Sequence, residues 1–231
     1  MKAENKSILK KAFTATLPIM AGYLVLGLGF GIILKSKGYG AIWAFAMSTV
    51  IYAGSMQYLA IDLICGGAGL LTTALTTLMV NARHLFYGIS MVEKYKNAGK
   101  AKPYLIYALS DETYSLVCVD MDMEEGERNK FCLFVTALDQ FYWVLGSVLG
   151  SLLGAVITFN TEGMDFALTA LFVTVFVEQW LSTKDHAAAM VGVAASVICL
   201  VIFGSGSFLI PSMVAITLAL TLMRKRQEAV Q

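Results

Sequence analysis

Long apolar stretches separated by short polar loops run along almost the entire 231-residue chain. Eight stretches stand out, with approximate bounds 13–34, 41–61, 67–92, 104–119, 131–158, 164–181, 187–203 and 207–223. A helix needs roughly 20 apolar residues to cross a bilayer, so the shortest stretches span it only if they are tilted or shielded by neighbours. The pattern predicts an all-α, polytopic membrane protein of about 7–8 transmembrane segments.

Composition supports the same class. Hydrophobic residues make up 58% of the chain and charged residues 14%, whereas soluble proteins carry about 25% charged residues. Because no long polar stretch remains, we expect residues 1–231 to form a single integral membrane domain in contact with the lipid bilayer. The net charge of +1 offers no field that would attract nucleic acid.

The placement of charge predicts an irregular topology. Lysines and arginines gather in the N-terminal tail, in the loop 94–102 and at 224–226, all of which favour the cytoplasm, while the loop 120–127 is acidic. Eight simple spans would put the N-terminus and the loop 94–102 on opposite sides. One segment is therefore expected to be re-entrant or broken, and the candidate is 67–92, which is polar near its centre.

A faint internal repeat also points to a transporter. Closely spaced glycines precede a span that ends near a glutamine, and the pattern recurs roughly 122 residues later: Gly27, Gly29, Gly31 and Gln57, then Gly146, Gly150, Gly154 and Gln179. Secondary transporters often build a midplane site from repeats with broken helices. We expect repeats at about 13–92 and 131–223, linked by a helix at about 104–119; chance resemblance between apolar helices is the alternative.

Arg83 is the charge that most needs explanation, because an ionised side chain at membrane depth costs several kcal/mol. Asn81 and His84 lie beside it. If the helix breaks here, the free backbone N–H groups and the guanidinium could together bind a substrate carboxylate. The alternative is that Arg83 pairs with an acidic residue or reaches the membrane surface. His84 is a candidate proton carrier.

Acidic residues at membrane depth supply the complementary charge. Asp111 and Glu112 follow Pro103 closely, and helical spacing would place Tyr107, Asp111 and Tyr114 on one stripe. Such a carboxylate could bind a substrate ammonium, carry a coupling proton or neutralise Arg83. All seven of the following are substrate-binding candidates: Arg83, Asn81, Asp111, Glu112, Gln57, Tyr107 and Tyr114.

Further polar residues carry open alternatives. Asp139, about nine residues into its apolar stretch, is a proton-coupling candidate with Glu178, unless it caps a helix at the interface. Gln57 could bind substrate or cross-link helices. The four cysteines form no metal-binding spacing, and the sequence has no phosphate loop or recognisable catalytic set, so we expect no metal, no cofactor and no enzyme activity.

Four motifs occur in order along the chain: Leu17-Pro18-Ile19, Tyr52-Ala53-Gly54-Ser55-Met56-Gln57, Asn81-Ala82-Arg83-His84-Leu85-Phe86-Tyr87 and Ser110-Asp111-Glu112-Thr113-Tyr114. Together they resemble the AzlC family, the large subunits of branched-chain amino acid exporters. In that family the second motif is closer to F-A-G-x-x-Q and the third to N-L-R-H-x-L-Y. Here Tyr52 replaces the Phe and Ala82 the Leu, which leaves the polar members in place.

The resemblance implies export of valine, leucine or isoleucine across the cytoplasmic (inner) membrane, together with a small AzlD-type membrane subunit. Our hypothesis is a secondary active, proton-coupled transporter with the substrate carboxylate at Arg83 and its ammonium at Asp111 or Glu112. Two alternatives stay open: a channel or exporter for another small solute, and a non-transporting intramembrane enzyme or assembly subunit.

Overall fold

The computed structural model describes residues 2–118, 123–156, 173, 176–177, 180–181, 186–204 and 208–228. Every regular element within them is a helix, in agreement with the all-α prediction. The chain forms two compact units, unit 1 (Met1–Ala167) and unit 2 (Leu168–Gln231), each of which is described by itself.

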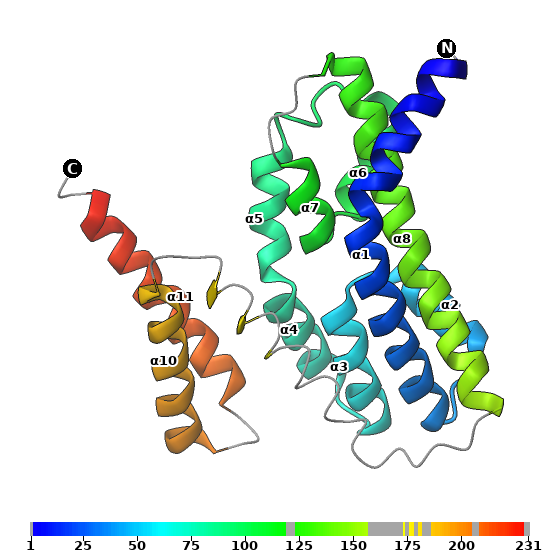
Figure 1. The fold of residues 1–231 in the computed structure, drawn as a ribbon. Coiled ribbons are helices and arrows are strands. Elements are labelled where there is room, and N and C mark those ends of the chain that lie inside the picture. Colours follow the sequence, from blue (N-terminus) through cyan, green and yellow to red (C-terminus); the bar gives the residue numbers. More distant parts are fainter. Residues whose placement is uncertain are drawn as a thin grey trace. The chain divides into compact units, whose positions relative to one another are not determined.

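Two long parallel helices form the frame of unit 1 (Figure 1). Helix α1 (Lys2–Ser36) and helix α8 (Glu125–Val156) each measure about 50 Å at 1.5 Å per residue. Within the described residues, these two helices are long and apolar enough to cross a membrane. Gly27 and Gly31 of α1 face Gly146 and Gly150 of α8 so closely that no Cβ would fit between the backbones. Four of the closely spaced glycines therefore lie at one shared helix–helix interface.

Helices α2 (Ala41–Val50) and α3 (Gly54–Cys65) form a hairpin rather than the single span expected over 41–61. Gln57 Nε2 donates to Ser48 Oγ at 3.1 Å, although a straight helix would separate these residues by about 13 Å. The chain reverses at Tyr52, whose φ of +40° is rare for a residue with a side chain. Each helix spans only about half of a 30 Å hydrocarbon core, so the pair is re-entrant.

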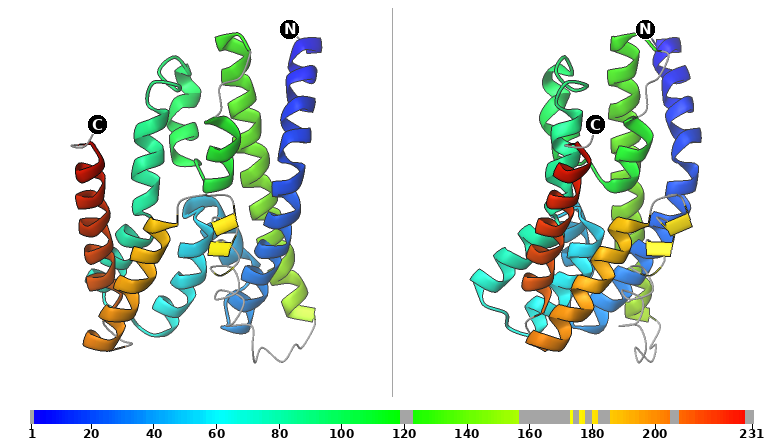
Figure 2. Two further views of the ribbon diagram at one scale, coloured as in Figure 1. Left: turned by 60° about the vertical axis from the view of Figure 1, so that its left-hand side comes forward. Right: turned by 90° about the vertical axis from the view of Figure 1, so that its left-hand side faces the viewer.

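The segment 67–92 breaks where the sequence predicts a break. Helix α4 (Leu70–Val80) ends at Asn81, and helix α5 (Ala82–Met91) begins directly after it. Asn81 has φ −93° and ψ 5°, outside the helical values, and it lies between two helices that follow one another along unit 1 (Figure 2). This segment is broken but not re-entrant.

The prediction of one helix over 104–119 is wrong, because two short helices form a hairpin there. Helix α6 (Lys102–Tyr107) follows a 3-10 turn (Gly99–Ala101), and helix α7 (Asp111–Val117) starts anew at Ser110, whose Oγ caps it by accepting from Thr113 N at 3.1 Å. With this break, the predicted stripe of Tyr107, Asp111 and Tyr114 along one helix is also wrong.

Both outer ends of this second hairpin lie at one end of unit 1. Asn97 Nδ2, before α6, donates to Glu125 Oε1 at 2.7 Å, and Glu125 begins α8, the next helix after α7. Lys94 Nζ donates to the carbonyl of Cys118 in the same place. A crossing helix would hold these loops a membrane thickness apart, so α6 and α7 are re-entrant from this end.

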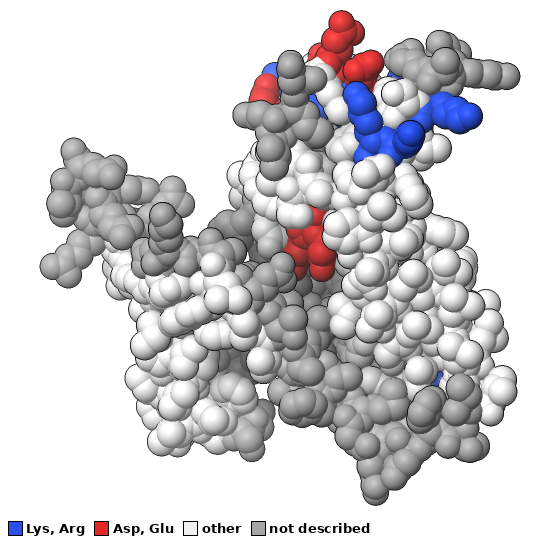
Figure 3. All heavy atoms as spheres, in the orientation of Figure 1, with Lys and Arg blue, Asp and Glu red and all other residues white. Residues whose placement is uncertain are grey.

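The N-terminus shares that end. A buried apolar cluster joins the start of α1 to the loop before α6, to α6 and α7 and to the start of α8; its members include Ile8, Ala12, Tyr95, Leu105 and Phe131. Figure 3 shows most of the visible lysines and arginines there. The basic N-terminus and the loop 94–102 thus lie at the same end of unit 1. The reason is that the hairpin α2–α3 replaces the single span expected over 41–61.

Cysteine labelling tests this topology. In a cysteine-free background, single cysteines at Lys96 and Glu124 are expected to react with a membrane-impermeant maleimide from the same side, because both exposed residues flank the re-entrant pair α6–α7. A cysteine at Lys37, in the exposed loop after α1, is the control and is expected to react only from the opposite side. Opposite reactivity of positions 96 and 124 would mean that 102–117 crosses the membrane.

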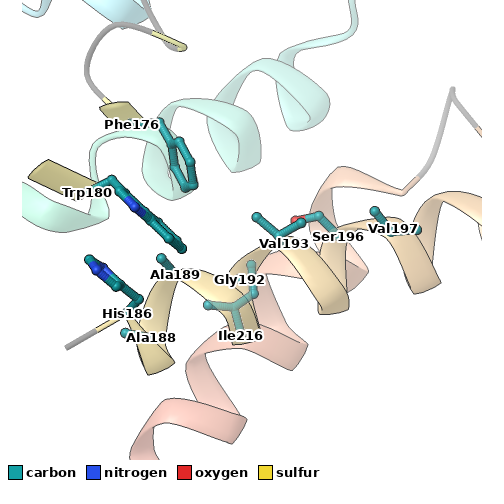
Figure 4. Close-up of a pocket in the computed structure, with 10 residues that line it drawn as sticks. All are labelled: Phe176, Trp180, His186, Ala188, Ala189, Gly192, Val193, Ser196, Val197 and Ile216. Carbon is teal, nitrogen blue, oxygen red and sulfur yellow. The ribbon is translucent and has the colours of Figure 1, made fainter. Parts of the chain in front are cut away.

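Unit 2 contains helix α10 (Ala187–Phe203) and helix α11 (Leu209–Glu228), close to the stretches expected at 187–203 and 207–223. The stretch expected at 164–181 lies almost wholly outside the described residues. An apolar cavity of about 620 Å³ opens between these elements, and the Trp180 ring stacks on the His186 ring at 4.0 Å beside it (Figure 4).

Candidate functional site

The tips of the two hairpins meet near the middle of α1 and α8. The Tyr107 hydroxyl, at the end of α6, donates to the carbonyls of Thr49 and Val50 at the end of α2. Gln140 of α8 connects both tips, since its Nε2 donates to Thr49 O at 3.4 Å and its Oε1 accepts from Tyr104 at 2.8 Å. Each hairpin therefore ends against the other rather than in lipid.

Five polar side chains gather beside these tips, and we call them the polar centre: Tyr23, Ser110, Glu112, Thr113 and Asp139. The Tyr23 hydroxyl lies 2.6 Å from Glu112 Oε2 and 2.7 Å from Ser110 Oγ. Ser110 Oγ lies 3.1 Å from Thr113 Oγ1, which lies 2.7 Å from Asp139 Oδ2. Side chains from α1, from α7 and its N-cap Ser110, and from α8 thus form one continuous row of oxygens.

The two carboxyl groups of the polar centre differ in access. Asp139 has 0% of its surface exposed, and its Oδ1 has no hydrogen-bond partner among the described residues. Glu112 is partly exposed. Figure 3 shows acidic atoms halfway along unit 1, apart from the charged side chains that gather at one end of it. Asp139 therefore lies inside α8 and not at an interfacial helix end, which excludes the capping role.

The Gln57 amide and the Trp143 ring form a wall next to the polar centre. The fully buried Gln57 accepts from Trp143 Nε1 at 2.8 Å and donates to Ser48, so its amide cross-links α2, α3 and α8. The Trp143 ring lies edge-on to the Tyr23 ring at 5.5 Å. Of the two roles considered for Gln57, the structure shows the helix-linking contacts.

The residues around Arg83 lie in the first turns of α5. His84 Nδ1 lies 3.2 Å from Asn81 O, and the His84 and Tyr87 rings contact edge-on at 6.0 Å. Tyr87 stacks on Tyr114 of α7 at 4.6 Å, which sets the first turns of α5 and α7 at the same level. The Arg83 side chain and all of Glu178 lie outside the described residues.

Comparison with known proteins identifies the family. A sequence model of the family described as AzlC protein matches residues 18–157, more than half of the chain. The chain belongs to the AzlC family. It is 44% identical over 219 residues to the branched-chain amino acid transport protein AzlC of Bacillus subtilis, which covers 95% of this chain and 86% of the relative. The resemblance carried by the four motifs is thereby confirmed.

Other relatives of the chain are also named as membrane proteins. An uncharacterized membrane protein of Helicobacter pylori is 40% identical over 95% of this chain and 96% of its own length. The inner membrane protein YgaZ of Escherichia coli is 24% identical over 79% of this chain and 78% of its own length. No solved structure matches. The similarity to these relatives, together with its two long apolar helices, identifies this member of the family as a membrane protein.

Of the polar centre, Glu112 and Asp139 could be predicted from the sequence, whereas the hydroxyls that join them could not. Tyr23, Ser110 and Thr113 are uncharged residues in or beside apolar stretches, where such residues usually only pack or bond their own backbone. The one available signal was Ser110 followed by Asp111 and Glu112, which is typical of a helix start. The described residues contain no group of three potential metal ligands.

Proposed function

We propose that this AzlC protein exports branched-chain amino acids, valine, leucine and isoleucine, as a secondary active transporter of the cytoplasmic membrane. The observation that carries the proposal is the 44% identity, over 95% of the chain, to a relative that is named as a branched-chain amino acid transport protein. The two opposed hairpins support it, because irregular backbone at membrane depth occurs where it is buried in protein or lines a cavity.

The substrate site is assigned to the first turns of α5 and α7. The break at Asn81 exposes the N-terminal end of α5, which carries a partial positive charge next to Arg83 and favours the substrate carboxylate. Asp111, in the first turn of α7, supplies the opposite charge for the ammonium. The stacked Tyr87 and Tyr114 lie one turn further on and offer an apolar wall to an aliphatic side chain.

The remaining assignments complete the transport cycle. Alternating access requires the hairpin tips, held by Tyr107 and Gln140, to separate in one state. The basic end of unit 1 faces the cytoplasm by the positive-inside rule. A small AzlD-type membrane protein is the second subunit, and a proton gradient drives export.

Flux measurement tests the function. Proteoliposomes with this protein, alone and with a co-purified small subunit, are expected to move radiolabelled valine, leucine and isoleucine faster than lysine or glycine. Asp111→Asn removes a charge-assisted bond to the ammonium and is expected to lower valine flux about tenfold or more. Asp62→Asn is the matched control, because Asp62 is exposed near the end of α3.

Each alternative gives a different result. Flux without preference for branched side chains would assign the protein to another small solute. A stable complex with the small subunit but no flux of any amino acid would make it an assembly subunit. Full valine flux by Asp111→Asn at normal expression would overturn the site assignment and leave the transport function in place.

A further inference from the structure

We propose that the polar centre holds one proton that its two carboxyl groups share, and that this row of oxygens is a proton path between Glu112 and the buried Asp139. The path runs through the hydroxyls of Tyr23, Ser110 and Thr113. Its four oxygen–oxygen distances are 2.6, 2.7, 3.1 and 2.7 Å, all within hydrogen-bonding range.

Counting hydrogens gives the single shared proton. Four hydrogen bonds connect the two carboxyls, and each needs one hydrogen. The three hydroxyls supply only three, because Tyr, Ser and Thr each carry one O–H. Ser110 also accepts from the backbone N–H of Thr113, but that hydrogen lies outside the row. The fourth hydrogen therefore belongs to a carboxyl oxygen of the row, Glu112 Oε2 or Asp139 Oδ2. Protons on both of these oxygens would leave two hydrogens facing each other at one contact.

Two arrangements satisfy every bond. In the first, Glu112 is protonated and donates to Tyr23, and each hydroxyl donates onward until Thr113 donates to ionised Asp139. In the second, Asp139 is protonated and all four bonds point the other way. In the shift between them each hydroxyl gives up one hydrogen and receives another, so one proton leaves Glu112 and one arrives at Asp139 with no other net change.

The surroundings favour one proton over none. Without it the row would hold two negative charges at membrane depth, one of them on the fully buried Asp139, at a cost of several kcal/mol. The other titratable groups near the row are Tyr52, close to both carboxyls, and Tyr104, close to Asp139. Asp111 precedes Glu112 in the chain. Neither tyrosine is ionised at neutral pH, so neither changes the count.

The two carboxyls at the ends of the row differ in their exposure to solvent. Glu112 is partly exposed and Asp139 is buried, so the row connects an accessible carboxyl to an inaccessible one. Both hairpin tips lie against it, and their movement would change which carboxyl meets water. The use of this path to drive amino acid export rests on the proposed function, whereas the shared proton does not.

Infrared spectroscopy of the purified protein at neutral pH tests the proton count directly. Glu112→Gln and Asp139→Asn are each expected to remove the same amount of the carbonyl-stretch band of protonated carboxyls, because either amide supplies the fourth hydrogen through its NH₂ group. The double variant is expected to lose no more than either single variant. An unchanged band in either single variant, or a loss in the double that equals the sum of two separate losses, would overturn the shared proton.

Flux measurements test the path. Tyr23→Phe removes the hydroxyl that joins Glu112 to Ser110 but keeps the ring against Trp143, and it is expected to lower the ratio of proton-gradient-driven to exchange flux of valine about tenfold or more. Tyr58→Phe is the matched control, since Tyr58 is equally buried and its hydroxyl bonds Leu26 O, away from the row. A ratio for Tyr23→Phe equal to the control's would overturn the path.

The two proposals fail in distinguishable ways. If the wild-type protein moves no valine in either assay, the export function fails while the infrared result still decides the shared proton. If the wild-type protein exchanges valine and the band loss is additive, the proton proposal fails and export stands.

Discussion

Gly150→Ala is expected to prevent normal packing of α1 against α8 and to lower both the yield and the thermal stability of the protein. A Cβ at Gly150 would lie 2.7 Å from Leu28 Cα and 2.8 Å from Leu28 C, and these backbone atoms cannot rotate away as a side chain would. Overpacking of this kind costs about 1–3 kcal/mol or more. The polar centre also depends on this contact, because Tyr23 lies on α1 and Asp139 on α8.

Gly22→Ala is the matched control, since Gly22 also lies within α1 and a Cβ there meets no atom within 4 Å. Alanine favours helix over glycine by up to about 1 kcal/mol, so this variant is expected to keep or raise stability. Melting temperatures from fluorescence-detected size exclusion compare the two. A Gly150→Ala protein that melts with the wild type would show that the two backbones do not approach as closely as described.

Trp143→Ala is the second substitution with a large expected effect. Trp143 is 4% exposed, packs against Tyr23 and Phe30, and donates to Gln57 Oε1. Its loss leaves a cavity and a buried amide oxygen without its donor, and cavity formation from Trp→Ala costs about 3–5 kcal/mol in soluble proteins. The expected result is a strong fall in melting temperature and in valine flux.

Trp43→Ala provides the control, because Trp43 lies on α2 and is 54% exposed. Its removal is expected to leave the melting temperature near that of the wild type. Trp143→Phe separates the two causes, since it keeps most of the ring and removes only the N–H; an intermediate melting temperature is expected. Equal stability of Trp143→Ala and Trp43→Ala would contradict the role of this wall in holding α2, α3 and α8 together.

Much of the candidate site could be predicted, because an ionised side chain at membrane depth costs free energy whatever path the chain takes. Arg83, Asp111, Glu112 and Asp139 stand out in an apolar sequence for that reason alone. The break beside Asn81 could also be predicted, since a polar run in the middle of a long apolar stretch is best placed at irregular backbone. The links between these residues could not, because Tyr23 reaches Glu112 across 89 positions.

The sequence by itself determined the class of this protein: apolar stretches of membrane length, basic loops and ionisable residues inside the stretches. Only the tertiary structure decided which stretches cross. Hydropathy measures the transfer of each residue into lipid, which is the same for a helix that crosses and for one that enters and turns back. The reversals at Tyr52 and Ser110 depend instead on contacts with distant helices, such as Tyr107 with Thr49 and Thr113 with Asp139. Those contacts form only when α1, α8 and both hairpins pack together.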